Sequence, residues 1–451
     1  MRSQCFRLMA PSLYSRPIEI TTALEIPTYL LPTGMTKLKI HLMKTFLLTS
    51  FLFCFGLGAF AQRIDANRIY YHIDYLASDD LNGRATSSDD EIKAARYIAK
   101  KFRQFGLEPM GSDGYYYPFE YKVSKNPKDS TLAKTEPREG TNVVAFLDNG
   151  ASTTIVIGAH FDHLGLGHDH NSLDANPEGK IHNGADDNAS GVAGVLELAR
   201  YFSENDISEK HNFLFMTFSG EELGLLGSKK WCENPTLPLE KINYMINMDM
   251  IGRLNDSTKK LLIFGIGTSS AWKDVIEKTN HYFSVKEDSA GIGPSDQTSF
   301  YLKDIPVLHF FTGQHSDYHK PSDDIEKINI EGEVKVLELI IDIVEALDSQ
   351  PKLAFFKTKN AETPRMAFKV TMGVMPDYTY EEKGMRLDGV TDNKPAAKGG
   401  LQGGDIIIKI GDTAIESVKD YMKVLATLKK GDKVKVLLLR KGQPLEKEVE
   451  L

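Results

Sequence analysis

Two neighbouring acidic residues, Asp186 and Asp187, lie between small residues in the segment NGADDNASG, residues 183–191. Adjacent carboxylates repel one another, so a loop that is merely soluble has no need of this arrangement. A carboxylate that bridges two divalent cations would remove the repulsion. Small flanking residues would also let the backbone approach those ions closely. The segment therefore predicts a metal centre.

Further candidate ligands follow runs of strand character. Apolar runs occupy residues 153–158, 212–218, 242–248 and 305–311. The side chains that follow these runs are His160 with Asp162, Glu221 with Glu222, Asp249, and His315 with Asp317 and His319. In open α/β sheets the ligand crevice lies outside the carboxyl ends of the strands. We therefore expect these side chains to meet at one edge of one sheet.

This donor set determines which metals are chemically acceptable. Histidine and carboxylate without cysteine suit zinc, with cobalt or manganese also possible. The three cysteines, Cys5, Cys54 and Cys232, are too few and too scattered for a thiolate site or a disulfide framework. Two ions about 3.5–4 Å apart can stabilise both the attacking and the leaving oxygen of a displacement.

The elements that must position these groups alternate along the chain. Apolar residues recur at helical spacing over 90–107, 192–202 and 331–349, and the strand runs are continuously apolar. Continuous apolar strands separated by helices indicate a sheet that is covered on both faces. We expect an α/β fold with a mixed, largely parallel sheet.

Five segments together resemble the successive motifs of the dizinc aminopeptidases, zinc exopeptidases similar to bacterial leucyl aminopeptidases. They are GAHFDHLG (158–165), NGADDNASG, SGEELGLLGS (219–228), NMDMIG (247–252) and DYHKPSDD (317–324). YLASDDLNGR (75–84) is also similar to the opening segment of that family. The resemblance spans about residues 70–350 and implies a three-layer zinc-exopeptidase fold.

The resemblance also implies roles for particular residues. It assigns His160, Asp187 and Asp249 to one zinc, and Glu222 and His319 to the other, with Asp187 bridging both. Glu221 would be the general base and acid, and Asp162 would orient His160. Only the family distinguishes the role of Glu221 from that of Glu222. Family members share a cis peptide after the bridging residue, which predicts a cis bond between Asp187 and Asn188.

Other polar residues near these motifs have less specific interpretations. We expect His309 to be a core histidine whose ring nitrogens have hydrogen-bond partners. We expect the loop histidines to be solvated, the alternative being an extra metal site; they are His163, His168, His170 and His182. His315 is close in sequence to His319, and whether it lines the cleft stays open. Asp296 is either a neighbour of the ligands or a helix N-cap.

The C-terminal part has a different pattern. Residues 351–364 are interpreted as a linker, and residues 365–451 resemble a PDZ domain of the bacterial protease-associated type. Met372, Gly373 and Val374 match the loop whose backbone amides would capture a peptide C-terminus. The alternative is a module that only packs on the peptidase part.

The N-terminal part resembles a targeting signal. Residues 43–61 combine a basic start, an apolar run and an Ala-Phe-Ala cleavage site, so residues 1–42 are interpreted as a start-site misassignment. The mature chain, with a peptidase domain over 62–350, would be periplasmic or secreted and keep only Cys232. A net charge of −8 and the absence of a basic stripe argue against a nucleic-acid partner.

Three functions are compatible with these features. The first is an aminopeptidase that acts on peptides with a free N-terminus and carries a PDZ module. The second is a single-zinc acyltransferase similar to glutaminyl cyclase, against which the complete set His160, Asp187 and Asp249 argues. The third is an inactive PDZ scaffold, against which the presence of both Glu221 and Glu222 argues.

Overall fold

A computed structural model describes residues 63–124, 135–169, 171–174, 176–358, 370–376, 380, 382–390 and 394–451. The expected signal peptide and the segment before it lie outside the described residues. Within the described part of the chain, none of the helices has the length and apolar character that a membrane crossing requires. Export therefore stays a prediction.

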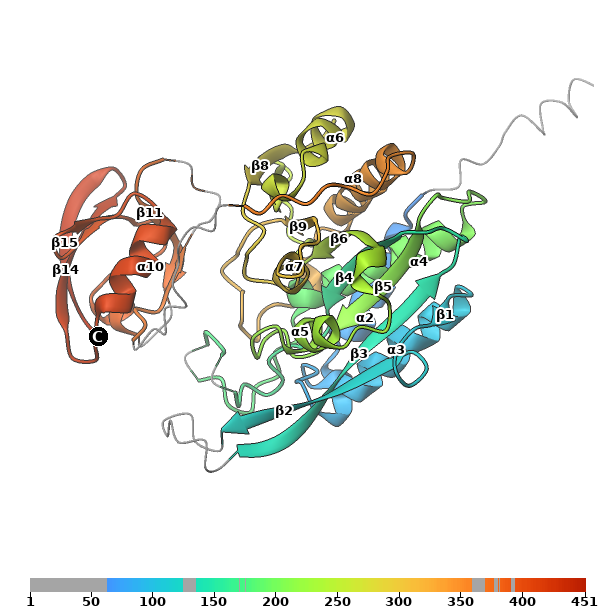
Figure 1. The fold of residues 1–451 in the computed structure, drawn as a ribbon. Coiled ribbons are helices and arrows are strands. Elements are labelled where there is room, and N and C mark those ends of the chain that lie inside the picture. Colours follow the sequence, from blue (N-terminus) through green and yellow to red (C-terminus); the bar gives the residue numbers. More distant parts are fainter. Residues whose placement is uncertain are drawn as a thin grey trace, which may run out of the picture. The chain divides into compact units, whose positions relative to one another are not determined.

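In the described part of the chain, a nine-stranded mixed sheet forms the larger unit, in the order β1-β3-β5-β4-β6-β9-β7-β8 with β2 paired to β3 (Figure 1). The central strands β5, β4, β6 and β9 are mutually parallel, whereas β3 and β7 join them in antiparallel fashion. The strands are β1 Glu108–Pro109, β2 Tyr116–Ser124, β3 Thr135–Leu147, β4 Thr154–His160, β5 Asn212–Phe218, β6 Ile242–Met248, β7 Lys260–Phe264, β8 Ser284–Asp288 and β9 Val307–Phe311. The predicted mixed, largely parallel sheet is confirmed.

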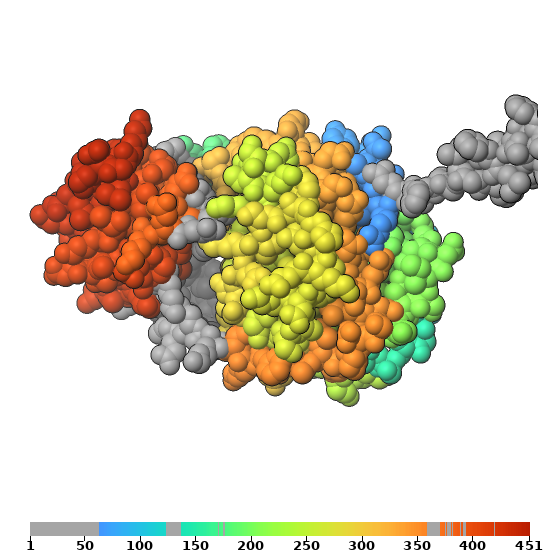
Figure 2. All heavy atoms as spheres, turned by 90° about the horizontal axis from the view of Figure 1, so that it is seen from above, coloured from blue at the N-terminus to red at the C-terminus, as the bar shows by residue number. Residues whose placement is uncertain are grey.

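Helices cover both faces of this sheet because successive strand residues point to opposite sides. In β4, Ile155 and Ile157 join the core beneath five helices, whereas Val156 joins the core beneath the other two. The first group is α2 Ala66–Leu76, α3 Asp89–Gln104, α4 Gly191–Glu204, α6 Ala271–Thr279 and α8 Ile330–Leu347; the second is α5 Leu226–Glu233 and α7 Gln297–Tyr301. Helices α6 and α8 pack against each other, where the yellow and orange surfaces adjoin in Figure 2.

Local sequence explains the start of helix α3. Its N-cap Ser88 accepts a hydrogen bond from the backbone N–H of Glu91, and acidic residues fill the first turn. Ala95, Ile98 and Phe102 are buried as predicted, but Ile92 is 41% exposed. The reason is geometric, because Ile92 lies at the edge of the buried stripe, about 90° around the helix from its centre.

The C-terminal unit is a second, smaller sheet. Its order is β10-β11-β12-β14-β15, with β13 paired to β12. Its elements are β10 Val374–Pro376, β11 Met385–Val390, α9 Pro395–Lys398, β12 Ile406–Ile410, β13 Thr413–Ala414, α10 Val418–Thr427, β14 Lys433–Arg440 and β15 Gln443–Glu450. Its own apolar core includes Ile407, Leu438 and Val449. Strand β10 pairs only with β11 among the described residues, so it is an edge strand.

The segment that follows α8 still forms hydrogen bonds with the larger unit. Leu353 donates its N–H to the side-chain oxygen of Asn243, and Phe356 donates to the carbonyl oxygen of Thr268. Thr358 contacts the hydroxyl of Tyr301. Residues 353–358, the first part of the expected linker, therefore extend the larger unit, and the boundary at 351 stays a prediction.

Candidate metal centre and active site

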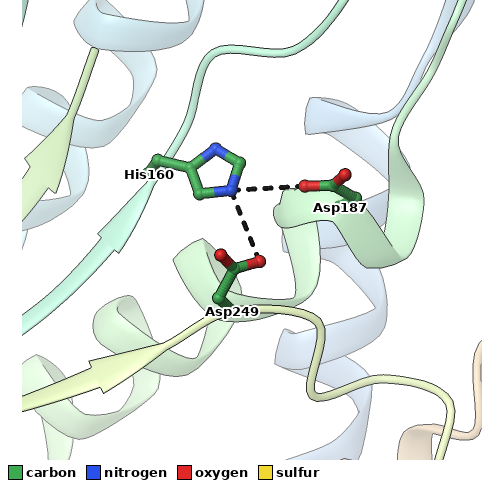
Figure 3. A group of neighbouring side chains, drawn as sticks. All are labelled: His160, Asp187 and Asp249. Carbon is green, nitrogen blue, oxygen red and sulfur yellow. Dashed lines mark ion pairs between the residues drawn. The ribbon is translucent and has the colours of Figure 1, made fainter. Parts of the chain in front are cut away.

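One cluster of side chains joins three segments at the carboxyl ends of the parallel strands. His160 ends β4, Asp249 follows β6, and Asp187 lies before α4 in a turn, Ala185–Ser190, where the backbone angles of Asp187 and Asn188 are not helical. His160 Nε2 lies 3.2 Å from an oxygen of Asp187 and 3.4 Å from an oxygen of Asp249 (Figure 3). These ligand atoms are close enough together to hold one metal ion.

A second cluster shares Asp187 with the first. His319 Nε2 lies 3.2 Å from Asp187 Oδ2 and 3.1 Å from Glu222 Oε2. The oxygen of Asp187 that faces His160 is Oδ1. One carboxylate thus presents each of its oxygens to a different histidine, which is the arrangement expected of a bridging ligand.

The turn that carries Asp187 has the predicted backbone. The peptide bond between Asp187 and Asn188 is cis, which confirms that prediction. The side chain of Asn188 accepts from the N–H groups of Gly191 and Met250 and donates to the carbonyl oxygen of Met248. These bonds tie the turn to the end of β6, next to Asp249.

Asp186 and Asp323 support this turn without facing the histidines of the two clusters. Asp323 accepts hydrogen bonds from the N–H groups of Asp186 and Asp187, at 3.0 and 3.1 Å. Asp186 accepts from the N–H of Gly252 and lies 3.1 Å from His315 Nε2. Asp186 therefore contacts the backbone of Gly252 and the side chain of His315 instead of the two clusters.

Asp162 contacts both His160 and the segment of Glu221, but through different atoms. The main-chain carbonyl oxygen of Asp162 lies 3.1 Å from His160 Nδ1, whereas its carboxylate is 3.8 Å away. The carboxylate accepts from the N–H of Glu221 at 3.1 Å and from the hydroxyl of Thr86 at 2.8 Å. Asp162 orients His160 through its backbone and places Glu221 through its side chain.

The clusters open into a pocket of about 500 Å³. Both glutamates line it, together with His160, Asp187, Asp249 and His319. The rest of the wall is mainly apolar or aromatic and includes Leu225, Met250, Phe264, Pro294, Phe311 and Tyr318. Such a pocket has room for an apolar side chain next to the polar cluster.

Burial and neighbouring charges shift the pKa values of the cluster. Burial raises the pKa of Glu221 well above its usual range, and repulsion from Asp249 and Glu222 adds to this although His160 opposes it. Burial also acts to raise the pKa of Glu222, but attraction to His319 and hydrogen bonds with His163 and His319 lower it to about 2.

The donor set fits a divalent cation. Among the described residues, no lysine or arginine forms an ion pair with Asp187, Asp249, Glu221 or Glu222. Buried carboxylates whose only basic partners are histidines are costly, whereas bound metal ions would neutralise them. Imidazole and carboxylate are the ligands that zinc takes in catalytic sites.

Comparison with known proteins agrees with this geometry. Residues 142–344 match peptidase family M28, and residues 370–451 match the PDZ domain. Residues 142–344 form an M28 peptidase domain. The expected family and the PDZ domain after it are therefore confirmed.

Named relatives of the M28 domain include aminopeptidases. The chain is 26% identical to the probable lipoprotein aminopeptidase LpqL of Mycobacterium tuberculosis over 278 residues, which cover 57% of this chain and 50% of that protein. The matched regions cover between about a third and a half of the first such relatives.

Solved structures with a similar fold have two kinds of activity. An aminopeptidase from Aneurinibacillus sp. strain AM-1 superposes with a TM-score of 0.50 and 19% identity, covering 66% of this chain and 96% of that one. The glutaminyl cyclase of Porphyromonas gingivalis superposes with a TM-score of 0.51 and 19% identity, covering 63% and 99%. At these identities the likeness shows the fold alone.

Several histidines that the resemblance did not assign to a metal ion differ from expectation. His163 and His182 are buried, so the solvated-loop interpretation is wrong for them, while His168 is exposed and His170 lies outside the described residues. His309 is buried, but neither ring nitrogen has a hydrogen-bond partner among the described residues. It lines the pocket and stacks on Phe264, so it is not a satisfied core histidine.

The structure decides between the two interpretations that the sequence left open for His315 and for Asp296. His315 bonds Asp186 and does not line the pocket. Asp296 precedes α7 but makes no side-chain capping bond, and it is fully buried near the cluster. Burial raises its pKa to about 7, with repulsion from Asp162 and Asp249 adding to the effect and His160 opposing it.

Arg84, to which the sequence motifs assigned no role, is fully buried beside the M28 site. Its guanidinium donates to the carbonyl oxygens of Phe161 and Leu76, each at 2.8 Å, of Gly184 at 2.9 Å, and of Asn183. Arg84 thus fixes the segments that carry the first cluster to each other. The only signal was its place in the segment YLASDDLNGR.

We expect Arg84→Met to lower the free energy of unfolding by about 3 kcal/mol or more, because buried carbonyls lose a charged donor. Arg96→Met is the matched control, since Arg96 is exposed on α3 and its change should stay within about 0.5 kcal/mol. Urea denaturation of both variants measures the difference. Equal stability of the two variants would contradict this role of Arg84.

Proposed function

We propose that the chain is a dizinc aminopeptidase. The observation that carries this proposal is the carboxylate of Asp187, whose two oxygens face His160 and His319 at 3.2 Å each. His160, Asp187 and Asp249 would hold one ion, and Asp187, Glu222 and His319 the other. Two bound zinc ions would acidify a water molecule and polarise a peptide carbonyl.

Glu221 is the proposed general base and acid. It lines the pocket beside both clusters, and among the described residues its carboxylate takes part in none of the ion pairs of these clusters. The Glu221 carboxylate can therefore exchange a proton. Glu221 would accept the proton of the attacking water and give it to the leaving amine. Asp162 supports this role by holding the N–H of Glu221.

The substrates would be peptides with a free N-terminus. The carboxylates of the clusters would attract the terminal ammonium group, and the apolar wall that includes Phe264 and Phe311 would receive the first side chain. The relative LpqL is named a probable lipoprotein aminopeptidase, which supports both the activity and export of this chain. We therefore place the enzyme in the periplasm or outside the cell.

The PDZ domain would recruit peptides by their C-termini. Strand β10 has a free edge among the described residues, and an added peptide strand could pair there. Gly373 has φ of 69°, a conformation that favours glycine and turns the loop before β10. The amides of Met372, Gly373 and Val374 are the proposed carboxylate-binding groups, although the N–H of Gly373 also reaches Thr371 Oγ1 at 3.0 Å.

Metal content and substrate class together test the proposed activity. The full-length chain should bind two zinc ions and hydrolyse aminoacyl anilides. One ion per chain with cyclisation of N-terminal glutamine would support the glutaminyl-cyclase alternative instead. A chain that binds no zinc ion and shows no turnover would support the inactive scaffold.

Glu221→Gln should lower turnover of an aminoacyl anilide by at least about 100-fold, because general acid–base catalysis typically contributes 10²- to 10⁴-fold. Its zinc content should stay at the wild-type value, since Glu221 is not a proposed ligand. Glu222→Gln, the matched control one residue away, should lose the second ion. Metal loss in Glu221→Gln with retention in Glu222→Gln would show that the two roles are reversed.

Deleting residues 365–451 should leave hydrolysis of short anilides nearly unchanged, because every proposed ligand lies before residue 365. The deletion should slow hydrolysis of long peptides that end in an apolar residue. The same peptides with an amidated C-terminus control for length, and the deletion should not affect them. Loss of zinc or of short-substrate activity in the truncated chain would instead make the module structural.

A further inference from the structure

His163 lies three residues after β4 and is held by backbone on two sides. Its N–H donates to the carbonyl oxygen of Arg84 at 3.3 Å. A Cβ atom at Gly184 would come within 2.5 Å of Cδ2 and 2.6 Å of Cγ of the His163 ring. The glycine of the segment NGADDNASG is thus required to make room for this imidazole.

The ring contacts the second cluster through one nitrogen. His163 Nδ1 lies 2.8 Å from Glu222 Oε1, whereas Glu222 Oε2 lies 3.1 Å from His319 Nε2. The distance from Nδ1 to Asp187 Oδ2 is 3.9 Å, too long for a hydrogen bond. The two oxygens of Glu222 therefore face different histidines.

We propose that His163 is a positioning residue for the second metal ion. Its Nδ1–H donates to Oε1 of Glu222, which leaves Oε2 as the oxygen that binds the ion beside His319. This inference rests on the proposed two-ion centre and adds a residue to it. No motif of the sequence assigned His163 this role.

The alternative is that His163 is itself a ligand, because His163, Asp187 and Glu222 also lie close enough to hold an ion. The contact favours a donor. Nε2 of His163 is buried and has no hydrogen-bond partner among the described residues. A proton on Nδ1 leaves an acceptor unpaired at Nε2, which costs less than an unpaired buried N–H. It also gives an anionic carboxylate a charge-assisted hydrogen bond.

Zinc affinity of the full-length chain tests this role. The metal-free protein is titrated with Zn²⁺ in competition with a chelator of known affinity. His163→Leu should weaken binding of the second ion by about 10- to 100-fold, as changes to such outer partners of metal ligands do. Binding of the first ion should not change, because His160, Asp187 and Asp249 are intact.

His163→Asn separates donation from ligation. Its Nδ2 takes nearly the place of Nδ1 and can donate to Glu222, so it should restore most of the second-ion affinity. The absorption spectrum of the chain saturated with Co²⁺ should then equal that of the wild type, because the ligand set is unchanged. His211→Leu is the control: His211 is equally buried but lies before β5, at the opposite end of the sheet, and should bind both ions normally.

Two results would overturn the inference. In the first, His163→Leu binds both ions as the wild type does or loses both equally. In the second, His163→Asn binds as weakly as His163→Leu and its Co²⁺ spectrum shows the loss of a nitrogen ligand, which would make His163 a ligand. A wild-type chain that binds one ion would instead overturn the two-ion proposal itself.

Discussion

The carboxylate of Asp187, shared between His160 and His319, is the contact on which the rest of the site depends. The two histidines come from distant parts of the chain, one at the end of β4 and one after β9. Both imidazole rings can approach the same carboxylate only if the backbone around Asp187 leaves both of its oxygens accessible. The small neighbours of Asp187 and the hydrogen bonds that the turn donates to Asp323 meet this requirement.

Charge sets the second constraint. Four carboxylates line one pocket, and Arg84, the cation that is buried beside them, gives its hydrogen bonds to carbonyl oxygens instead. Burial lowers the pKa of Arg84 to about 10, although attraction to Asp187 and Asp162 opposes this. Arg84 therefore stays charged at neutral pH. Its positive charge partly offsets the negative charge of the carboxylates without occupying the place of a metal ion. The carboxylates remain available as ligands.

Sequence predicted the central strands and their polar ends because the relevant signals are local. An apolar run followed by His or Glu can be recognised without knowing its neighbours, and parallel packing then brings the ends together. The edge strand β8 was missed because its residues are mostly exposed. Arg84 and His163 were missed for another reason: Arg84 contacts Asn183, 99 residues away, and His163 contacts Glu222, 59 residues away, and no spacing reveals such contacts.

Asp162 shows why the positions of the site residues depend on one another. Its carbonyl oxygen orients the imidazole of His160, and its carboxylate holds the N–H of Glu221 and the hydroxyl of Thr86. A shift of Asp162 would therefore displace a proposed metal ligand, His160, and the proposed base, Glu221, together. Thr86 in turn follows Arg84 by two residues, and Arg84 holds the carbonyl oxygen of Gly184. The proposed base, the first ligand and the bridging turn are thus positioned by a single chain of contacts, most of which use the backbone.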